Sequence, residues 1–405
     1  MNNRDQVPMT EPPPLKGIRV LDLCIVLAGP TCGRTLAQYG AEVIKIDPDH
    51  RLPQLTPWLD VGRGKRSISL NLNKPGGIEA FLKLADSADV IIEGFRKGVT
   101  ERLGIGYERL SERNPSLIYG SINCFGHEGP WQLRPGFEQN AQAATGVQLR
   151  NSGIPLDLNS ENVKPRPATF TLNDYGTGIS AAFAIMLAIL ERNKTGIGQK
   201  VEAALSYTSS TITGSSNIDY DGFNREEIGG PGARGKDYFN RLYECSDGWI
   251  FISASTELER DNLKAIPYFC QAIQLGEVHS IEKIFKTKSV SDWQIILNNS
   301  GIPAVRNNTA LDLHADPYNQ ENELVIKTDY EYSSSDIPKD QTNWGNTTWP
   351  GNPVSMSGTN LIDVVAPSFG ADTHQVLKEI GISDIDISRM VQNGTIPADL
   401  PIPLI

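Results

Sequence analysis

An alternation of strand-like and helix-like segments near the start of the chain restricts the fold more than any other feature. Residues 18–25 (IRVLDLCI) are apolar and β-branched, which is typical of a buried strand. Residues 27–33 (LAGPTCG) contain the glycines and proline of a tight strand-to-helix turn. A short helix is predicted over about 31–39, and a second strand over 41–46 (AEVIKI). This β-α-β order predicts a parallel sheet with right-handed crossovers.

The same alternation continues along the first 125 residues and beyond, and it predicts a doubly wound α/β unit. The further helices are predicted over 75–88, 100–114 and 175–194, and the further strands over 89–95, 117–123 and 199–203.

A second lobe is predicted to begin near residue 220. Residues 219–235 form a polar, glycine-dense stretch (DYDGFNREEIGGPGARG), typical of a loop. Residues 243–253 (YECSDGWIFIS) predict a hairpin that turns at Asp247 and Gly248. Helical patches follow to about residue 316, and residues 330–359 are predicted to be a long connector. The chain then returns to helix at about 373–380.

Composition limits the classes of partner. With 405 residues, 39% hydrophobic and 21% charged, the chain can bury a core in more than one lobe. A net charge of −11 argues against nucleic acid or an anionic membrane as the main partner, although a local basic cluster can still bind a small anion.

Several patterns indicate a soluble protein of a reducing compartment, the cytoplasm. The first residues are polar and proline-rich, without the apolar core of a secretory signal. The longest apolar run, 179–190, is too short to span a bilayer and favours a buried helix. The five cysteines are scattered, without a C-x-x-C pair, and the five histidines show no metal-ligand spacing. We therefore predict neither a disulfide framework nor a metal site.

Two glycine-containing segments are candidate binding loops. The turn at 27–33 lacks the G-x-G-x-x-G spacing of a dinucleotide site, so its glycines equally suit close packing of helix and strand. Residues 62–67 (GRGKRS) form a basic loop that can hold phosphate oxygens, although they lack P-loop spacing. A solvated basic turn is the alternative.

Asp174, in the segment NDYGTG, precedes the most apolar helix of the chain. One interpretation is an N-cap, since aspartate is favoured there. The other is a carboxylate nucleophile, kept ionised by the field of the helix N-terminus. Gly176 and Gly178 are predicted to leave room for a ligand.

In order along the chain, these segments resemble the family III CoA-transferases, which include carnitine CoA-transferase and formyl-CoA transferase. The resemblance lies in L-K-G-I-R-V-L-D-L with V-L-A-G-P-T-C-G-R-T-L-A-Q-Y-G-A-E-V-I-K-I-D, in R-G-K-R-S-I-S-L-N-L, and in D-V-I-I-E-G-F-R-K-G-V-T-E-R-L-G-I-G-Y-E-R-L. It continues in N-D-Y-G-T-G, in R-N-K-T-G-I-G-Q-K-V, in R-L-Y-E-C-S-D-G-W-I-F-I and in G-A-D-T-H-Q-V-L-K-E-I-G. These blocks span nearly the whole chain.

The resemblance implies an interlocked homodimer of α/β subunits. Each subunit would have a Rossmann-like large domain, built from residues 1–218 and 331–405, and a smaller α+β domain of residues 219–330. Coenzyme A or acyl-CoA would be a substrate, with no tightly bound cofactor, and Asp174 would be catalytic. The implied CoA contacts are Val26, Leu27, Ala28, Arg63, Lys65, Arg66, Gly94, Phe95, Arg96 and Arg102.

The implied reaction moves CoA from an acyl-CoA to a carboxylic acid. Asp174 attacks the thioester to give a mixed anhydride, and the CoA thiolate then forms an aspartyl-CoA thioester that the acceptor acid resolves. Backbone N–H groups of the 229–235 loop could stabilise the oxyanion, so Gly229, Gly230 and Gly232 are candidate substrate contacts. This loop departs from the run of consecutive glycines in formyl-CoA transferases.

Two other functions remain open. Related 2-methylacyl-CoA racemases have a histidine where this chain has Phe137, so racemase or isomerase chemistry lacks its imidazole here. The neighbouring Glu138 either orients substrate or begins a helix. The other alternative is a non-catalytic paralogous subunit of a heteromeric CoA-transferase, which the retained Asp174 argues against.

Overall fold

The computed structural model describes residues 12–48, 50–51, 55–152, 167–223, 234–330, 345–362 and 364–400. Two compact units divide these residues. The first contains the described residues of 1–147, 167–219 and 327–405, and the second those of 148–166 and 220–326.

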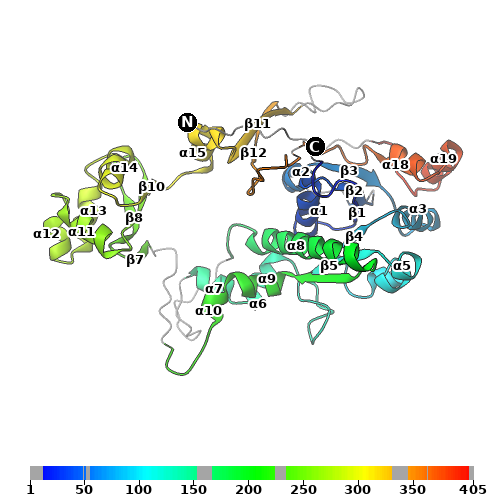
Figure 1. Ribbon diagram of the computed structural model, residues 1–405, viewed down its shortest axis with the longest axis horizontal. Helices are drawn as coiled ribbons and strands as arrows, with labels where there is room; N and C mark the ends of the chain where they lie inside the picture. The colour runs from blue at the N-terminus through cyan, green and yellow to red at the C-terminus, as the bar shows by residue number, and fades with distance from the viewer. Residues whose placement is uncertain are drawn as a thin grey trace. The chain divides into compact units, whose positions relative to one another are not determined.

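The first unit is built on a six-stranded parallel sheet with the strand order β3-β2-β1-β4-β5-β6 (Figure 1). The strand order reverses between β1 and β4, so ligands are expected beyond the carboxyl ends of these two strands. The predicted parallel α/β architecture is confirmed. The strands are β1 (Arg19–Asp22), β2 (Glu42–Asp47), β3 (Lys65–Ser69), β4 (Val90–Glu93), β5 (Ile118–Asn123) and β6 (Lys200–Ala204).

Helices cover both faces of this sheet. Successive residues of each central strand point to opposite faces and therefore pack in two different hydrophobic cores. Val20, Val43 and Val90 pack with α1 (Ala28–Gln38) and α8 (Leu172–Thr195). Their neighbours in the chain pack in the other core with a second group of helices. That group is α3 (Pro75–Ala85), α5 (Tyr107–Arg113), α18 (Thr373–Glu379) and α19 (Asp384–Gln392).

The helices α1 and α8 lie side by side and approach each other closely at Gly178 (Figure 1). A Cβ atom at Gly178 would lie 2.4 Å from the carbonyl oxygen of Ala28. At Gly176 it would lie 3.0 Å from a terminal carbon of Ile212. The prediction that these two glycines leave room for a ligand is therefore wrong, because both face neighbouring helices.

Helix α8 is longer than the apolar run within it. Of the helices in the described ranges, it alone is long and apolar enough, by length and composition, to cross a membrane. Half of its most apolar stretch is buried in the protein. The apolar run at 179–190 is itself too short to span a bilayer, as predicted, and it is the longer helix around it that meets the length criterion. The buried half packs against α1 and β5, as in the core helix of a folded domain.

The second unit contains a four-stranded antiparallel sheet in the order β10-β9-β8-β7. Its strands are β7 (Gly235–Asp237), β8 (Asn240–Glu244), β9 (Trp249–Ser253) and β10 (Ala304–Arg306). An aromatic core holds the sheet to its helices: the rings of Tyr243 and Phe285 stack 4.2 Å apart, and the indole of Trp293 donates to the carbonyl of Phe285 at 2.8 Å. The predicted hairpin at 243–253 is confirmed as β8–β9. The helices are α11 (Glu257–Ala265), α12 (Cys270–Gln274), α13 (Val278–Phe285), α14 (Val290–Asn299), α15 (Ala310–Ala315) and α16 (Pro317–Glu321).

Three local predictions need correction. The helix predicted over 100–114 is two helices, because Gly104 adopts a left-handed φ of 72° between α4 (Val99–Leu103) and α5. The connector predicted over 330–359 contains β12 (Gly345–Pro350), which pairs with β11 (Val325–Tyr330). Helix α19 was not predicted. The remaining helices in the part of the chain that the structure describes are α2 (Leu55–Val61), α6 (Glu138–Ala144), α7 (Val147–Ser152), α9 (Leu205–Ile212) and α10 (Gly214–Asn217).

The close approach of α1 and α8 makes a prediction about stability. Gly178→Ala should lower the melting temperature, because the new methyl group meets a backbone carbonyl, and overpacking of this kind costs about 2 kcal/mol. Gly176→Ala is the matched control, since its new methyl group meets only side-chain methyl groups, of Ile212 and Thr208, and the variant gains about 1 kcal/mol in helix propensity. Calorimetry should show a loss for the first variant and little change or a gain for the second; equal effects would contradict the proposed contact.

Candidate active site

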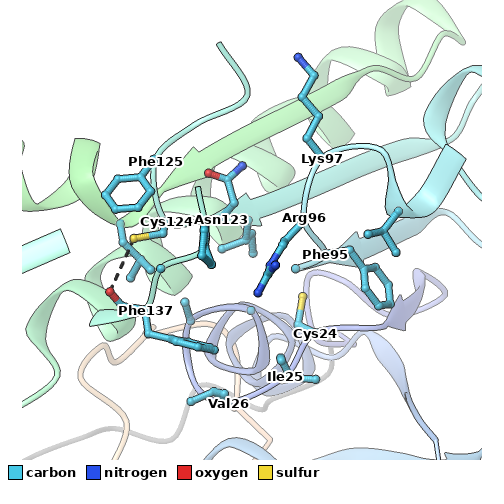
Figure 2. Close-up of a pocket in the computed structure, with 18 of the residues that line it drawn as sticks. Cys24, Ile25, Val26, Phe95, Arg96, Lys97, Asn123, Cys124, Phe125 and Phe137 are labelled. Atoms are coloured by element: carbon cyan, nitrogen blue, oxygen red, sulfur yellow. Dashed lines mark hydrogen bonds between the residues drawn. The ribbon is translucent and has the colours of Figure 1, made fainter. Parts of the chain in front are cut away.

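A cavity of about 560 Å³ lies beyond the carboxyl ends of β1, β4 and β5, where the topology favours a ligand site. Its wall is formed by the segments that follow these three strands, together with Arg51, residues 132–137, Asp174 and Leu205. In Figure 2 the side chain of Arg96 extends into the cavity between Cys24 and Asn123, while that of Lys97 points away.

The structure brings together most of the predicted site residues. Asp174 lines the cavity together with seven of the ten predicted CoA contacts, namely Val26, Leu27, Ala28, Gly94, Phe95, Arg96 and Arg102. Val26 has a φ of 65°, which a β-branched residue rarely adopts, so the backbone is strained at the cavity wall. The predicted substrate contacts Gly229, Gly230 and Gly232 lie outside the described residues.

The basic residues of the predicted 62–67 loop do not line this cavity. Lys65 and Arg66 lie in strand β3, where Lys65 is fully buried and pairs with Asp22 at 2.7 Å. Arg66 donates to both carboxylate oxygens of Glu379 at 2.8 Å, and it also pairs with Glu42. Arg63 is 3% exposed and pairs with Asp60 at 3.2 Å.

These three cations therefore form ion pairs that fix β3, and the turn before it, to neighbouring segments of the first unit. Of the two interpretations of residues 62–67, the solvated basic turn is wrong for Lys65 and Arg66, because β3 pairs with β2 in parallel register from Lys65 onward, while the phosphate-holding loop stays a prediction. Glycine spacing alone gave no sign of this long-range pairing.

Asp174 lies in the first turn of α8 rather than at its N-cap. The helix begins at Leu172 after Thr171, whose side chain makes no capping hydrogen bond, so the N-cap interpretation of Asp174 is wrong. The Asp174 side chain is largely buried, with 7% of its residue surface exposed. Burial and the nearby Glu138 carboxylate raise the pKa of Asp174 to about 7. The expectation of a fully ionised carboxylate is therefore corrected, because desolvation outweighs the field of the helix N-terminus.

Glu138 supplies the acceptor that the N-terminus of α8 lacks. Its carboxylate accepts the backbone N–H of Asp174 at 2.8 Å and that of Asn173 at 3.3 Å, while Gln142 donates to it at 2.8 Å. The residue is 4% exposed and begins α6, so of its two interpretations the structure confirms that it begins a helix. It does not line the cavity, and it acts on the site through the backbone that carries Asp174.

Apart from Phe137, sequence reasoning missed the wall contributed by the segment after β5. Cys124, Phe125, Gly126 and residues 132–137 line the cavity, and the ring of Phe125 meets that of Trp131 edge to face at 5.3 Å. The rule that ligands bind at strand ends, applied to the predicted strand at 117–123, would have indicated this segment. The thiol of Cys124 is a poor nucleophile, because burial and the carboxylates of Asp174 and Glu138 raise its pKa to about 12.

Side chains in the described ranges do not form a metal centre: no group of three or more His, Cys, Asp or Glu residues is arranged to hold an ion there.

The raised pKa of Asp174 predicts a pH-dependent stability. In the unfolded chain the carboxyl ionises near 3.8, but in the folded protein only near 7, so its ionisation destabilises the fold fully above pH 7 and progressively less as the pH falls toward 3.8. At 1.36 kcal/mol per pKa unit, the cost at pH 8 is on the order of 4 kcal/mol. Asp174→Asn should therefore raise the melting temperature at pH 8, and by less than half as much at pH 5.

The matched control is Asp261→Asn, since this carboxylate has a 70% exposed side chain. Scanning calorimetry at both pH values makes the comparison. If Asp174→Asn is no more stable than the wild type at pH 8, the conclusion that burial and Glu138 raise the pKa of Asp174 is wrong.

Known proteins resemble the chain over nearly its full length. Residues 15–373 match the family model described as CoA-transferase family III. The chain is 30% identical to the beta subunit of succinyl-CoA–L-malate CoA-transferase from Chloroflexus aurantiacus, over 93% of this chain and 96% of that protein. It is 28% identical to succinyl-CoA:glutarate CoA-transferase from Homo sapiens, over 97% of this chain and 92% of that protein.

A solved structure agrees with these sequence matches. The crystal structure of a CAIB/BAIF family protein from Brucella suis has a TM-score of 0.75 and 27% sequence identity, and the match covers 91% of this chain and 100% of that chain. The extent of the family match, the 30% identity over almost the whole chain and the shared fold lead to one conclusion. The chain belongs to CoA-transferase family III and is an enzyme that transfers CoA between acids.

Proposed function

We propose that Asp174 is the nucleophile that takes the acyl group from an acyl-CoA and returns CoA to a carboxylic acid acceptor. The observation that carries this proposal is the composition of the cavity wall: among the described residues that line it, Asp174 alone has a carboxylate. A nucleophile must be desolvated to be reactive and ionised to attack. A buried carboxylate with a pKa of about 7 meets both conditions near neutral pH.

The reaction proceeds through two covalent states. An oxygen of Asp174 attacks the thioester carbonyl, so the carbon–sulfur bond breaks and a mixed anhydride and a CoA thiolate form. The thiolate then attacks the carbonyl carbon of Asp174, which releases the donor acid and leaves an aspartyl-CoA thioester. The acceptor carboxylate repeats these two steps in the opposite direction. Because each step exchanges one activated acyl group for another, the barriers are lowered without a resident cofactor.

Charge on the cavity wall supports a CoA-binding role. Although the whole chain has a net charge of −11, five cationic residues line the cavity, namely Arg51, Arg96, Lys97, Arg102 and Arg134, and of these Lys97 turns its side chain away from it (Figure 2). Such a cluster attracts the phosphates of CoA. We assign Arg96 and Arg102 to the phosphates, and the backbone at Val26–Ala28 and Gly94–Phe95 to the remainder of the CoA chain.

Phe137 argues against racemase chemistry. This ring is 55% exposed and lines the cavity, at the position where racemases have a histidine. A phenyl ring cannot accept or donate the α-proton, so the proposal remains acyl and CoA transfer.

Trapping of the covalent states tests the nucleophile. After incubation with a panel of acyl-CoAs, hydroxylamine should convert Asp174 to its hydroxamate, which peptide mass spectrometry detects. Asp174→Asn should lose about a thousand-fold or more in transfer rate, because it removes the attacking group. Cys124→Ala is the control within the same cavity, and it should keep the label at Asp174. A label on another residue, or no label with any acyl-CoA, would contradict the proposal.

The acylation rate should also depend on pH. Because only the ionised carboxylate attacks and its pKa is about 7, the single-turnover rate should rise about tenfold per pH unit below 7 and level off above it. Rapid-quench measurement of acyl-enzyme formation between pH 5 and 9 provides the profile. A rate that is flat across this range would show that another group, or another step, controls acylation.

We propose further that the enzyme is an interlocked homodimer in a reducing compartment such as the cytosol. An apolar stripe along α8 supports the dimer: Ile179, Phe183, Leu187 and Leu190 recur at helical spacing and are 48–59% exposed. Exposed apolar stripes of this kind are typical of subunit interfaces. The five cysteines are free thiols, which supports the compartment.

A charge placed on this stripe should break the dimer. In light scattering, Phe183→Lys should change the protein from a dimer, with twice the mass of the chain, to a monomer. The reason is that a two-fold symmetric interface would bury the new charge of both subunits. Leu258→Lys, at a 72% exposed apolar residue on α11, is the control and should leave the mass unchanged. A monomeric wild type, or wild-type protein that sediments with lipid vesicles, would contradict the dimer. Turnover by the purified chain alone would exclude a non-catalytic subunit.

A further inference from the structure

The two loops that form opposite walls of the cavity meet at a buried polar cluster outside it. One loop follows β4 and carries Gly94, Phe95 and Arg96, and the other follows β5 and carries residues 124–137. The sheet register sets Glu93, the last residue of β4, directly beside Ser121 of β5. Both are nearly inaccessible to solvent, with 3% and 1% exposure.

Hydrogen bonds link this pair to both loops. One carboxylate oxygen of Glu93 accepts the backbone N–H of Phe95 at 2.7 Å, and the other accepts the hydroxyl of Ser121. The Ser121 oxygen lies 2.7 Å from Nε2 of His127, in the second loop. When Glu93 is ionised, its carboxylate can only accept, so Ser121 donates its single proton to Glu93 and accepts from the Nε2–H of His127.

A second link joins the same loops nearer the surface. The ammonium group of Lys97 donates to the backbone carbonyl of His127 at 2.8 Å and to the side-chain amide oxygen of Gln132. The loop after β4 is therefore tied to the loop after β5 by Lys97 and by the Glu93–Ser121–His127 chain. Displacement of one loop requires breaking a buried hydrogen bond or moving the other loop with it.

We propose that Glu93, Ser121 and His127 are positioning residues that hold the two loops at the separation that fits the CoA part of the substrate. The inference rests on the proposed function, since it assigns these loops to CoA. None of the three residues needs to touch the reacting atoms. Their loss should therefore weaken binding of CoA and leave the chemical step at Asp174 largely intact.

The carboxylate of Glu93 depends on its donors. Burial raises its pKa to about 7, and the hydrogen bonds from Ser121 and Phe95 act in the opposite direction. Removal of the Ser121 hydroxyl leaves a buried carboxylate with one donor fewer, which is costly. To offset the lost hydrogen bond, the Glu93 carboxylate must either turn toward other donors or take up a proton and become neutral. Either change loosens its hold on the N–H of Phe95.

Ser121→Ala provides the test, because it deletes one hydroxyl and leaves Glu93 and His127 in the chain. Ser69→Ala is the matched control: Ser69 also lies in the parallel sheet, is 0% exposed, and its hydroxyl makes no hydrogen bond within the described residues. His127→Ala is the second variant. It removes the imidazole at the other end of the Glu93–Ser121–His127 hydrogen-bond chain, and His127 lies in a partly exposed loop. Each protein is measured for CoA affinity by calorimetry, and for KM, kcat and acylation of Asp174.

Ser121→Ala and His127→Ala should each weaken CoA binding about tenfold and raise KM for acyl-CoA by the same factor, with kcat within about threefold of the wild type. Ser69→Ala should change neither constant. The inference is overturned if both variants bind CoA as Ser69→Ala does and lose only thermal stability, or if kcat falls while KM is unchanged.

The readouts separate this inference from the proposed function. If the wild type binds CoA but no acyl group reaches Asp174, the nucleophile proposal fails, whereas a tenfold loss of CoA affinity in Ser121→Ala still supports the positioning role. If the wild type turns over and the variants bind CoA normally, the positioning role fails alone. A wild type that does not bind CoA overturns both.

Discussion

The hydrogen bonds from the start of α8 to the carboxylate of Glu138 are the interaction on which the site depends. A helix N-terminus has N–H groups without partners, and Thr171 does not cap this one with its side chain. Glu138, which lies in another helix, α6, accepts hydrogen bonds from two of these N–H groups, and one of them belongs to Asp174 itself. The same carboxylate repels the side chain of Asp174. One buried residue thus fixes the position of the proposed nucleophile and brings its pKa close to neutrality.

Local sequence signals predicted much of the fold, for a physical reason. Strands buried on both faces are mostly apolar, so the segments that became β1, β2, β4 and β5 are visible as runs rich in apolar, β-branched residues. The errors arise where distant pairing decides the structure. Lys65 and Arg66 look like part of a basic loop, but pairing with β2 draws them into a strand.

The site was predictable only in part, for the same reason. The helix and motif around Asp174 are local, and the resemblance to a family identified them. The contact between Glu138 and Asp174 joins residues 36 positions apart, and no spacing rule shows it. The wall after β5 was within reach of the strand-end rule, yet its residues carry no motif of their own. The cavity combines a cationic wall with one buried carboxylate in a chain that is acidic overall.

The central claim is that an oxygen of Asp174 takes part in each transfer, and isotopic labelling of the acceptor tests it most directly. An acceptor acid labelled with heavy oxygen in its carboxylate should leave one heavy oxygen in the peptide containing Asp174 after a single turnover, because the acceptor oxygen becomes the bridging atom of the second anhydride. A later turnover should pass that atom to the released donor acid whenever the heavy oxygen is the one that attacks the thioester. A peptide that stays unlabelled while CoA is transferred, with the heavy oxygen retained by the acceptor or lost to water, would contradict the account.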